Sequence, residues 1–170
     1  MVSISKYEAL AQRNLEDHKR IRRLDILKEF PFKNYLMTAE IKGCDLLEFV
    51  EQAVAKAEHC LGAFPHFSNG VVVKYDSSKQ PMHRLVEMTL NDQPIDPERI
   101  YTISTVNFLL EGGDDLTAMK KATIKEHQCN GSLMFDVICE WIECHRKLES
   151  KKEGRICDLS AKDTNLMYRF

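Results

Sequence analysis

The sequence lacks several features that would assign it to particular classes of protein. It has no apolar run near the roughly eighteen residues that a membrane span needs, and its N-terminal "MVSISKYEAL" contains no signal-peptide core. The formal net charge of -2 argues against a nucleic-acid binder driven by phosphate neutralisation. One basic cluster, from His18 to Arg23, is interpreted as a solvated helix face or loop, with a polyanion contact as the weaker alternative. We therefore expect neither a membrane span nor a nucleic-acid polymer as partner.

The cysteines and histidines do not form the spacings of a metal site. The six cysteines contain no CxxC pair, and the six histidines are isolated from one another and from carboxylate clusters. The cysteines are Cys44, Cys60, Cys129, Cys139, Cys144 and Cys157. We expect reduced, mostly packed thiols, and a disulfide involving Cys129 or Cys157 stays open as an alternative. The sequence predicts no metal-binding site within this chain.

The chain of 170 residues, 44% of them hydrophobic, is long enough for one domain with a real core. Apolar periodicity predicts a single α+β unit spanning residues 1–170, with a mixed β-sheet packed against helices. Helices are expected over the first twenty residues, at 22–32, from Cys44 to Cys60, and from about Ser132 to Lys151. The last of these should bury a stripe that includes Trp141 and His145. Strands are expected at 34–41, 71–75, 84–90, 100–106 and 154–159.

Glycine is scarce, with 7 residues in 170, yet two glycines are adjacent in "NFLLEGGDDL", which runs from Asn107 to Leu116. This loop, "EFPFKN" around Phe32 and "LGAFPHFSNG" at 61–70 all combine aromatic rings with small or polar residues. Rings can stack on a base, carboxylates accept hydrogen bonds from ribose, and glycine permits close approach of the backbone. Taken singly, each loop has a commoner explanation, which is core packing for a phenylalanine and a simple turn for Gly-Gly-Asp.

The order of the motifs gives these pieces a family resemblance. The Pro-Phe corner at Phe32 is followed by "YDSSKQP" at 75–81, "PIDPERIY" at 94–101 and "NFLLEGGDD" at 107–115. In this order they resemble the C-terminal domain of 5'-nucleotidases, a family that includes UDP-sugar hydrolases and cyclic-nucleotide phosphodiesterases. The similarity runs from about Ile21 to Ala122, and a weaker match continues to the last expected strand.

The resemblance assigns roles to particular residues of this chain. It implies that Phe32 and Phe108 clamp the nucleobase between them, and that Asp114 binds the nucleoside. It also places Asn34 and Gly62 beside the ligand.

Two positions depart from the family pattern. Arg13 falls where the family has a phosphate-binding arginine, but the flanking glycines of that motif are absent here. A plain surface position is therefore an equal alternative for Arg13. Asp115 stands where the family usually has Gly, so we expect a restricted or altered backbone and an additional negative charge beside Asp114.

In the family, hydrolysis is two-metal chemistry carried out by a separate N-terminal metallophosphoesterase domain with divalent ions such as Zn or Mn. The signatures of that domain (Asp-x-His, Gly-Asn-His and Gly-His-x-His) do not occur in this sequence. The resemblance thus implies the substrate-recognition domain of a phosphate-ester hydrolase, inactive by itself. Its partners would be a nucleotide or nucleoside and the N-terminal domain.

A stand-alone, non-catalytic module for protein association is the alternative, favoured by Asp115 and by the altered segment around Arg13. The location stays open. Relatives are mostly periplasmic, secreted or on the cell surface, whereas the scattered cysteines fit an intracellular location equally well.

Overall fold

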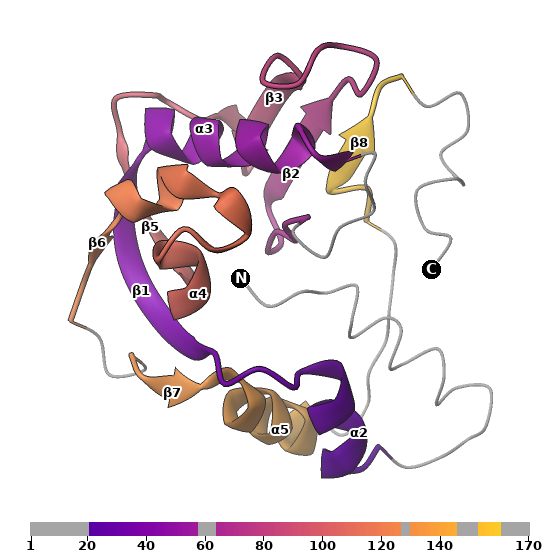
Figure 1. Ribbon diagram of the computed structural model, residues 1–170, viewed down its shortest axis with the longest axis vertical. Coiled ribbons are helices and arrows are strands. Elements are labelled where there is room, and N and C mark those ends of the chain that lie inside the picture. Colours follow the sequence, from indigo (N-terminus) through magenta and orange to yellow (C-terminus); the bar gives the residue numbers. More distant parts are fainter. Residues whose placement is uncertain (1–20, 58–63, 127–129, 146–152, 161–170) are drawn as a thin grey trace.

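The computed structural model describes residues 21–57, 64–126, 130–145 and 153–160, and the predicted α+β class is confirmed (Figure 1). The helix expected over the first twenty residues lies outside this part of the chain, as do Arg13 and Gly62. The strands form two sheets, each with four strands, in place of the one mixed sheet that the sequence suggested. Within the described part, no helix is both long enough and apolar enough to cross a bilayer.

The first sheet is built on the long strand β1 (Tyr35–Lys42), which Figure 1 shows running from the lower helices to the upper layer. On one side β1 pairs antiparallel with β5 (Ile100–Val106), and the register places Leu36 opposite Val106 and Lys42 opposite Ile100. On its other side lie two short strands, β6 (Thr123–Ile124) and β7 (Ser132–Leu133). Both predicted long strands, at 34–41 and 100–106, are thereby confirmed within a residue.

The second sheet has the strand order β4-β3-β2-β8. Within it, β2 and β8 run parallel to each other. Its strands are β2 (Val71–Tyr75), β3 (Leu85–Leu90), β4 (Gln93–Pro94) and β8 (Ile156–Asp158). The turn between β2 and β3 is the "YDSSKQP" motif, in which the Asp76 carboxylate accepts a hydrogen bond from the backbone N–H of Ser78 at 3.0 Å. This motif is therefore a structural turn.

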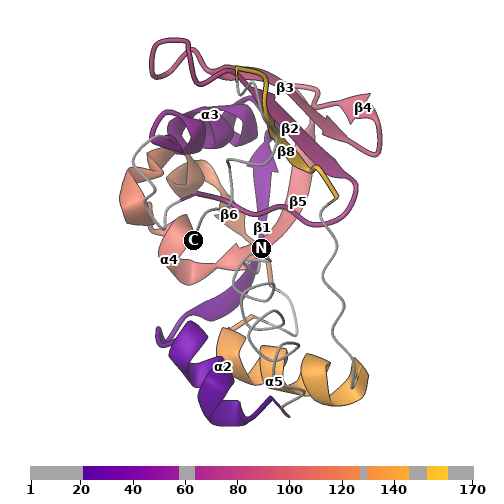
Figure 2. The same cartoon turned by 90° about the vertical axis from the view of Figure 1, so that its right-hand side faces the viewer.

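Helix α3 (Gly43–Val54) supplies much of the main hydrophobic core, and Figure 2 shows it beside the second sheet. Its buried apolar side chains are Leu46, Phe49, Val50, Ala53 and Val54. They recur at the three- and four-residue intervals of a helix face, as the sequence predicted. The helix ends at Val54, before the predicted end at Cys60, which lies outside the described residues.

The first backbone N–H groups of α3 have no hydrogen-bond partner within the helix, and carbonyls of the "PIDPERIY" motif accept them. The backbone N–H of Gly43 donates to the carbonyl of Arg99 at 2.8 Å, and that of Cys44 donates to the carbonyl of Pro97 at 2.9 Å. Tyr101 fixes the motif itself, because its hydroxyl accepts the backbone N–H of Asp96 at 2.8 Å. The motif therefore caps the helix and anchors it to the start of β5.

A second, smaller core lies at the lower end of β1, where α2 (Arg23–Glu29) packs on α5 (Met134–His145) (Figure 2). Its buried side chains are Ile26, Phe30, Val106, Met134, Ile138 and Cys139. The predicted burial of Trp141 and His145 is wrong: both are exposed, and their rings stack on each other at 4.1 Å. By spacing, both share a helix face with the buried Met134 and Ile138. The buried residues of α5 all lie in its first half, and Trp141 and His145 lie in its second half.

Two arginines of the basic cluster make ion pairs at the edge of this second core. Arg23 donates to the Asp136 carboxylate at 3.3 Å and thus links α2 to α5, while Arg22 pairs with Asp25 at 3.0 Å. Both arginines are exposed, Arg23 on α2 and Arg22 directly before it, so the interpretation as a solvated helix face or loop is confirmed for them. Among the described cysteines all are free thiols: Cys44, Cys139, Cys144 and Cys157.

Arg84 joins α3 to β3 from a buried position, with 3% of its surface exposed. Its guanidinium donates to the carbonyls of Val54 and Ala55, at 3.2 and 3.0 Å, and to the carbonyl of Lys79 at 3.0 Å. The positive charge therefore lies at the carboxyl end of the helix dipole, where a cation is favourable. In return, the Glu51 carboxylate accepts the backbone N–H of Arg84 at 2.8 Å.

We predict that Arg84→Met lowers the free energy of unfolding by about 2–4 kcal/mol, because three carbonyls lose their donor in a buried setting. Urea denaturation followed by circular dichroism measures this change. Lys74→Met is the control, since it removes a cation from an exposed pair with Glu87 and should barely move the midpoint. Equal midpoints for the two variants would contradict the capping role of Arg84.

Candidate functional site

The two phenylalanines that the sequence singled out lie in segments that meet at one end of the β1–β5 ladder. Phe32 is in the connection between α2 and β1 and is 65% exposed, and Phe108 is in the short helix α4 (Asn107–Leu110) and is 41% exposed. The segments are tied together by a hydrogen bond from the backbone N–H of Tyr35 to Oδ1 of Asn107, at 2.8 Å. Two exposed rings are thus carried by adjacent ends of paired strands.

The adjacent glycines fit the ring of Phe108. A Cβ added to Gly113 would lie 2.4 Å from two atoms of the Phe108 ring, so that only glycine lets the ring rest on the backbone. Gly112 ends α4 in the left-handed conformation, with φ at 80°, which glycine adopts without a steric cost. The loop expected here is instead α4 followed by two 3-10 helices, η2 (Gly113–Asp115) and η3 (Thr117–Lys121).

Asp114 and Asp115 follow directly and both have exposed side chains. Their φ values are 56° and 61°, in the left-handed region, so Asp115 occupies the conformation that the family's usual glycine would adopt freely. The Asp115 side chain is therefore held in a backbone conformation that costs more than it would for glycine. Lys56 reaches both residues: its Nζ donates to the Asp114 carbonyl at 3.1 Å and to Oδ2 of Asp115 at 3.0 Å. The additional negative charge thus has a cation beside it.

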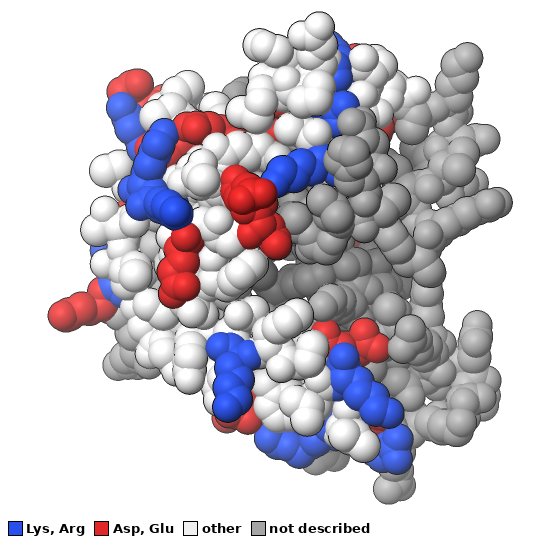
Figure 3. Space-filling view, viewed as in Figure 1, with Lys and Arg blue, Asp and Glu red and all other residues white. Residues whose placement is uncertain are grey.

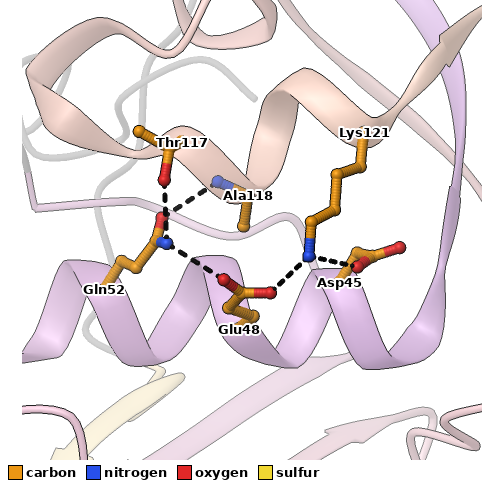
Figure 4. Close-up of polar contacts among 6 residues, drawn as sticks. All are labelled: Asp45, Glu48, Gln52, Thr117, Ala118 and Lys121. Atoms are coloured by element: carbon orange, nitrogen blue, oxygen red, sulfur yellow. Dashed lines mark hydrogen bonds and ion pairs between the residues drawn. The ribbon is translucent and has the colours of Figure 1, made fainter.

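Lys56, in the turn directly after α3, continues a polar stripe of that helix that faces the segment after the glycines. The α3 stripe is defined as Asp45, Glu48 and Gln52, which share one side of the helix by their three- and four-residue spacing, together with Lys56. Figure 4 shows its first three members reaching up to η3. The opposite side of the same helix packs into the main core.

Gln52 and Lys121 make the contacts of the stripe with η3 (Figure 4). The Gln52 amide accepts the backbone N–H of Ala118 at 3.1 Å and donates to the Thr117 hydroxyl at 3.1 Å. Lys121 donates to Glu48 at 2.6 Å and to Asp45 at 2.9 Å. These hydrogen bonds, first the one to Glu48, raise the pKa of Lys121 above its usual value, so it stays charged. The contacts hold η3, and with it the loop of Asp114, at a fixed place.

Asn34 lies two residues beyond Phe32 and is half-buried. Its backbone carbonyl accepts the N–H of Met134 at 2.9 Å, which links the segment to α5. Its side-chain amide has no hydrogen-bond partner within the described part of the chain, so its amide groups are available to a ligand. Gly62 and Arg13, the other predicted site residues, lie outside the described residues.

Sequence reasoning missed two contributors to this arrangement, the α3 stripe and Asn107. Lys56 and the rest of the α3 stripe could have been found from their helical spacing, because four polar residues recur opposite the apolar face. Asn107 carried no such signal, because its contact with Tyr35 depends on strand register.

The described part of the chain offers no metal centre of its own. No three His, Cys, Asp or Glu side chains within it lie close enough together to hold an ion. On the face drawn in Figure 3, acidic and basic side chains are interspersed over α3 and the 3-10 helices, without a patch of one sign. The arrangement can therefore bind and orient a ligand through rings, amides and a carboxylate, but the described residues supply no metal-activated nucleophile.

Comparison with known proteins identifies relatives of this domain. The family described as "5'-nucleotidase, C-terminal domain" matches residues 2–121, which is more than half of the chain. The trifunctional nucleotide phosphoesterase protein YfkN of Bacillus subtilis is 28% identical over 138 residues, covering 78% of this chain and 9% of that protein. An apyrase of Tabanus yao is 30% identical over 136 residues, covering 74% of this chain and 24% of its own.

A solved structure agrees with these matches. The 5'-nucleotidase precursor from Thermus thermophilus superimposes with a TM-score of 0.75 at 25% identity, covering 83% of this chain and 28% of that one. The chain thus spans less than a quarter of the length of the curated relatives just described. Both the sequence match and the fold lead to one assignment: this chain belongs to the family of 5'-nucleotidase C-terminal domains.

Proposed function

We propose that this chain is the nucleotide-recognition domain of a 5'-nucleotidase-like phosphate-ester hydrolase. Phe32 and Phe108 stack on the two faces of the nucleobase, and Asp114 accepts hydrogen bonds from the nucleoside. The observation that carries the proposal is the pair of exposed rings on segments joined by the bond between Asn107 and Tyr35. A base offers each ring a flat face to stack on, and stacking removes ring surface from water.

The remaining predicted residues take supporting places in the proposal. The amide of Asn34 donates to or accepts from the ligand beside Phe32, and Gly62 lets a neighbouring loop approach it. Arg13 is proposed to face the phosphate. Asp115, which favoured the alternative of a protein-association module, is accommodated here through its ion pair with Lys56.

The bond-breaking step is assigned to a metallophosphoesterase domain that carries two divalent ions and acts together with this chain. The described residues of this chain contain no group of side chains that would hold such a centre. The chain's own contribution is binding energy. Contacts to the non-reacting base hold the phosphate in one orientation towards the partner domain, which lowers the entropic part of the barrier.

The stacking proposal predicts that Phe32→Ala and Phe108→Ala each weaken adenosine binding by roughly 5- to 150-fold. Each variant loses one stacked ring face, which is worth about 1–3 kcal/mol. Isothermal titration calorimetry on the chain measures the dissociation constants. Ile100→Ala is the matched control, because Ile100 is 63% exposed and lies at the opposite end of β5.

We expect the control to bind adenosine as the parent does. If both phenylalanine variants also match the parent, the base is not held by these rings. If the parent itself binds no adenosine, the function as a protein-association module is favoured instead.

Asp114→Asn is predicted to weaken adenosine binding by roughly 10- to 150-fold, because hydrogen bonds to a charged acceptor are worth about 1.5–3 kcal/mol. Asp115→Asn is the matched control one residue away, since that carboxylate contacts Lys56. It should weaken binding far less. Isothermal titration calorimetry with adenosine measures both variants. An equal loss of affinity in the two would show that the net negative charge of the loop matters, and not a specific contact with Asp114.

The purified chain is predicted to release no phosphate from AMP in the presence of Mn²⁺ or Zn²⁺, because the described residues contain no group of metal ligands. A colorimetric phosphate assay against a protein-free blank measures this. Metal-dependent release that a chelator abolishes would show that the chain is catalytic by itself, contrary to the proposal.

A further inference from the structure

We infer that Asn107 is a positioning residue that sets the placement of Phe32 relative to Phe108, an inference that rests on the proposed function. It precedes Phe108 directly, and its side chain contacts the backbone of the strand that begins after Phe32. Its side chain therefore connects the segment that carries Phe32 to the segment that carries Phe108. No direct contact between Asn107 and the ligand is part of the inference.

The contacts of Asn107 fix the orientation of its amide. Oδ1 accepts the backbone N–H of Tyr35 at 2.8 Å, and Nδ2 donates to the Glu111 carboxylate at 3.4 Å. Because a carboxylate accepts but does not donate, Glu111 directs the amide nitrogen towards itself and leaves the oxygen for Tyr35. One side chain thus bridges the start of β1 and the end of α4.

Strand register explains why a side chain is needed at this place. The last rung between β1 and β5 pairs Leu36 with Val106, and α4 begins at Asn107, where the backbone turns away from β1. The N–H of Tyr35 therefore has no strand residue opposite it on this side. The Asn107 amide oxygen takes the position that a strand carbonyl would have had, and it extends the ladder by one donor.

The consequence for a base clamp follows from the distance dependence of stacking. Dispersion contacts lose about a quarter to a half of their strength when a gap of about 0.5–1 Å opens. Two rings can both stack on one base only if the distance between them matches the thickness of the base. Without the bond to Tyr35, the first residues of β1 can fray, and the segment of Phe32 is then free to move away from Phe108.

The chain supplies a matched control in Asn130. Its Oδ1 accepts the backbone N–H of Thr38 at 2.8 Å, and its Nδ2 donates to the carbonyl of Lys125. This is the same type of bond on the same strand, three residues further from Phe32. It is partly buried, whereas the bond of Asn107 is exposed, so loss of the control bond should cost at least as much stability.

The experiment compares Asn107→Ala with Asn130→Ala in the 170-residue chain, using three measurements. These are the urea midpoint, the hydrogen-exchange rate of the Tyr35 amide by NMR, and the dissociation constant for adenosine by calorimetry. Both variants should lower the midpoint. Only Asn107→Ala should accelerate exchange at Tyr35 and weaken adenosine binding, by about three- to tenfold, the value of one net hydrogen bond.

A rescue variant separates positioning from general loss of structure. In the double variant Asn107→Asp with Glu111→Gln, a carboxylate oxygen remains for Tyr35 and the new amide can donate to it. It should restore both the slow exchange and the affinity. If Asn107→Ala fails to fold, Asn107→Ser replaces it, because a serine hydroxyl is too short to reach Tyr35 but suits the start of a helix.

The outcomes distinguish this inference from the proposed function. If the phenylalanine variants weaken adenosine binding but Asn107→Ala binds as Asn130→Ala does, the positioning role is overturned and the clamp stands. If neither phenylalanine variant weakens binding, the clamp fails and the role of Asn107 fails with it. A fast Tyr35 amide with unchanged affinity would also overturn the inference.

Discussion

The antiparallel ladder between β1 and β5 is the constraint on which the rest of the structure depends. Its register is set by burial, since Ala39 and Ile41 on β1 are almost completely enclosed, and a shift by one residue would turn them outward. At one end the ladder leads into α3 and the motif that caps it. At the other end it leads to the segments of Phe32 and Phe108. Fixing the register therefore fixes the core and the candidate site together.

Helix α3 connects stability with the site through its two faces. One face places apolar side chains in the main core, and the opposite face, the α3 stripe, holds η3 and the loop of Asp114. The ion pairs of the stripe are exposed and individually weak, so their joint effect is to select one loop arrangement. Arg84 closes the far end of the helix. A loop with two residues in the left-handed region is thus supported from a rigid element.

Much of this architecture could be predicted from sequence, because periodicity and turn chemistry are local. The strands at 71–75 and 100–106 and the apolar face of α3 follow from alternation and helical spacing. The length of α5 that is buried could not be predicted, because Trp141 and Ile138 share one helix face and only the tertiary packing decides how far along that face burial extends. The helical turn at Asn107 was also missed, because its four residues suit a strand equally well.

In the candidate site, too, local sequence motifs could be recognised, whereas contacts that depend on tertiary structure could not. Phe32, Phe108 and Asp114 were proposed from the order of the motifs, whereas Asn107 and Lys56 make contacts that exist only once the chain has folded. The most direct test of the account is a nuclear Overhauser experiment on the chain with adenosine bound. The account predicts cross-peaks from the adenine ring protons to the ring protons of both Phe32 and Phe108. Cross-peaks to neither ring, with adenosine demonstrably bound elsewhere, would contradict it.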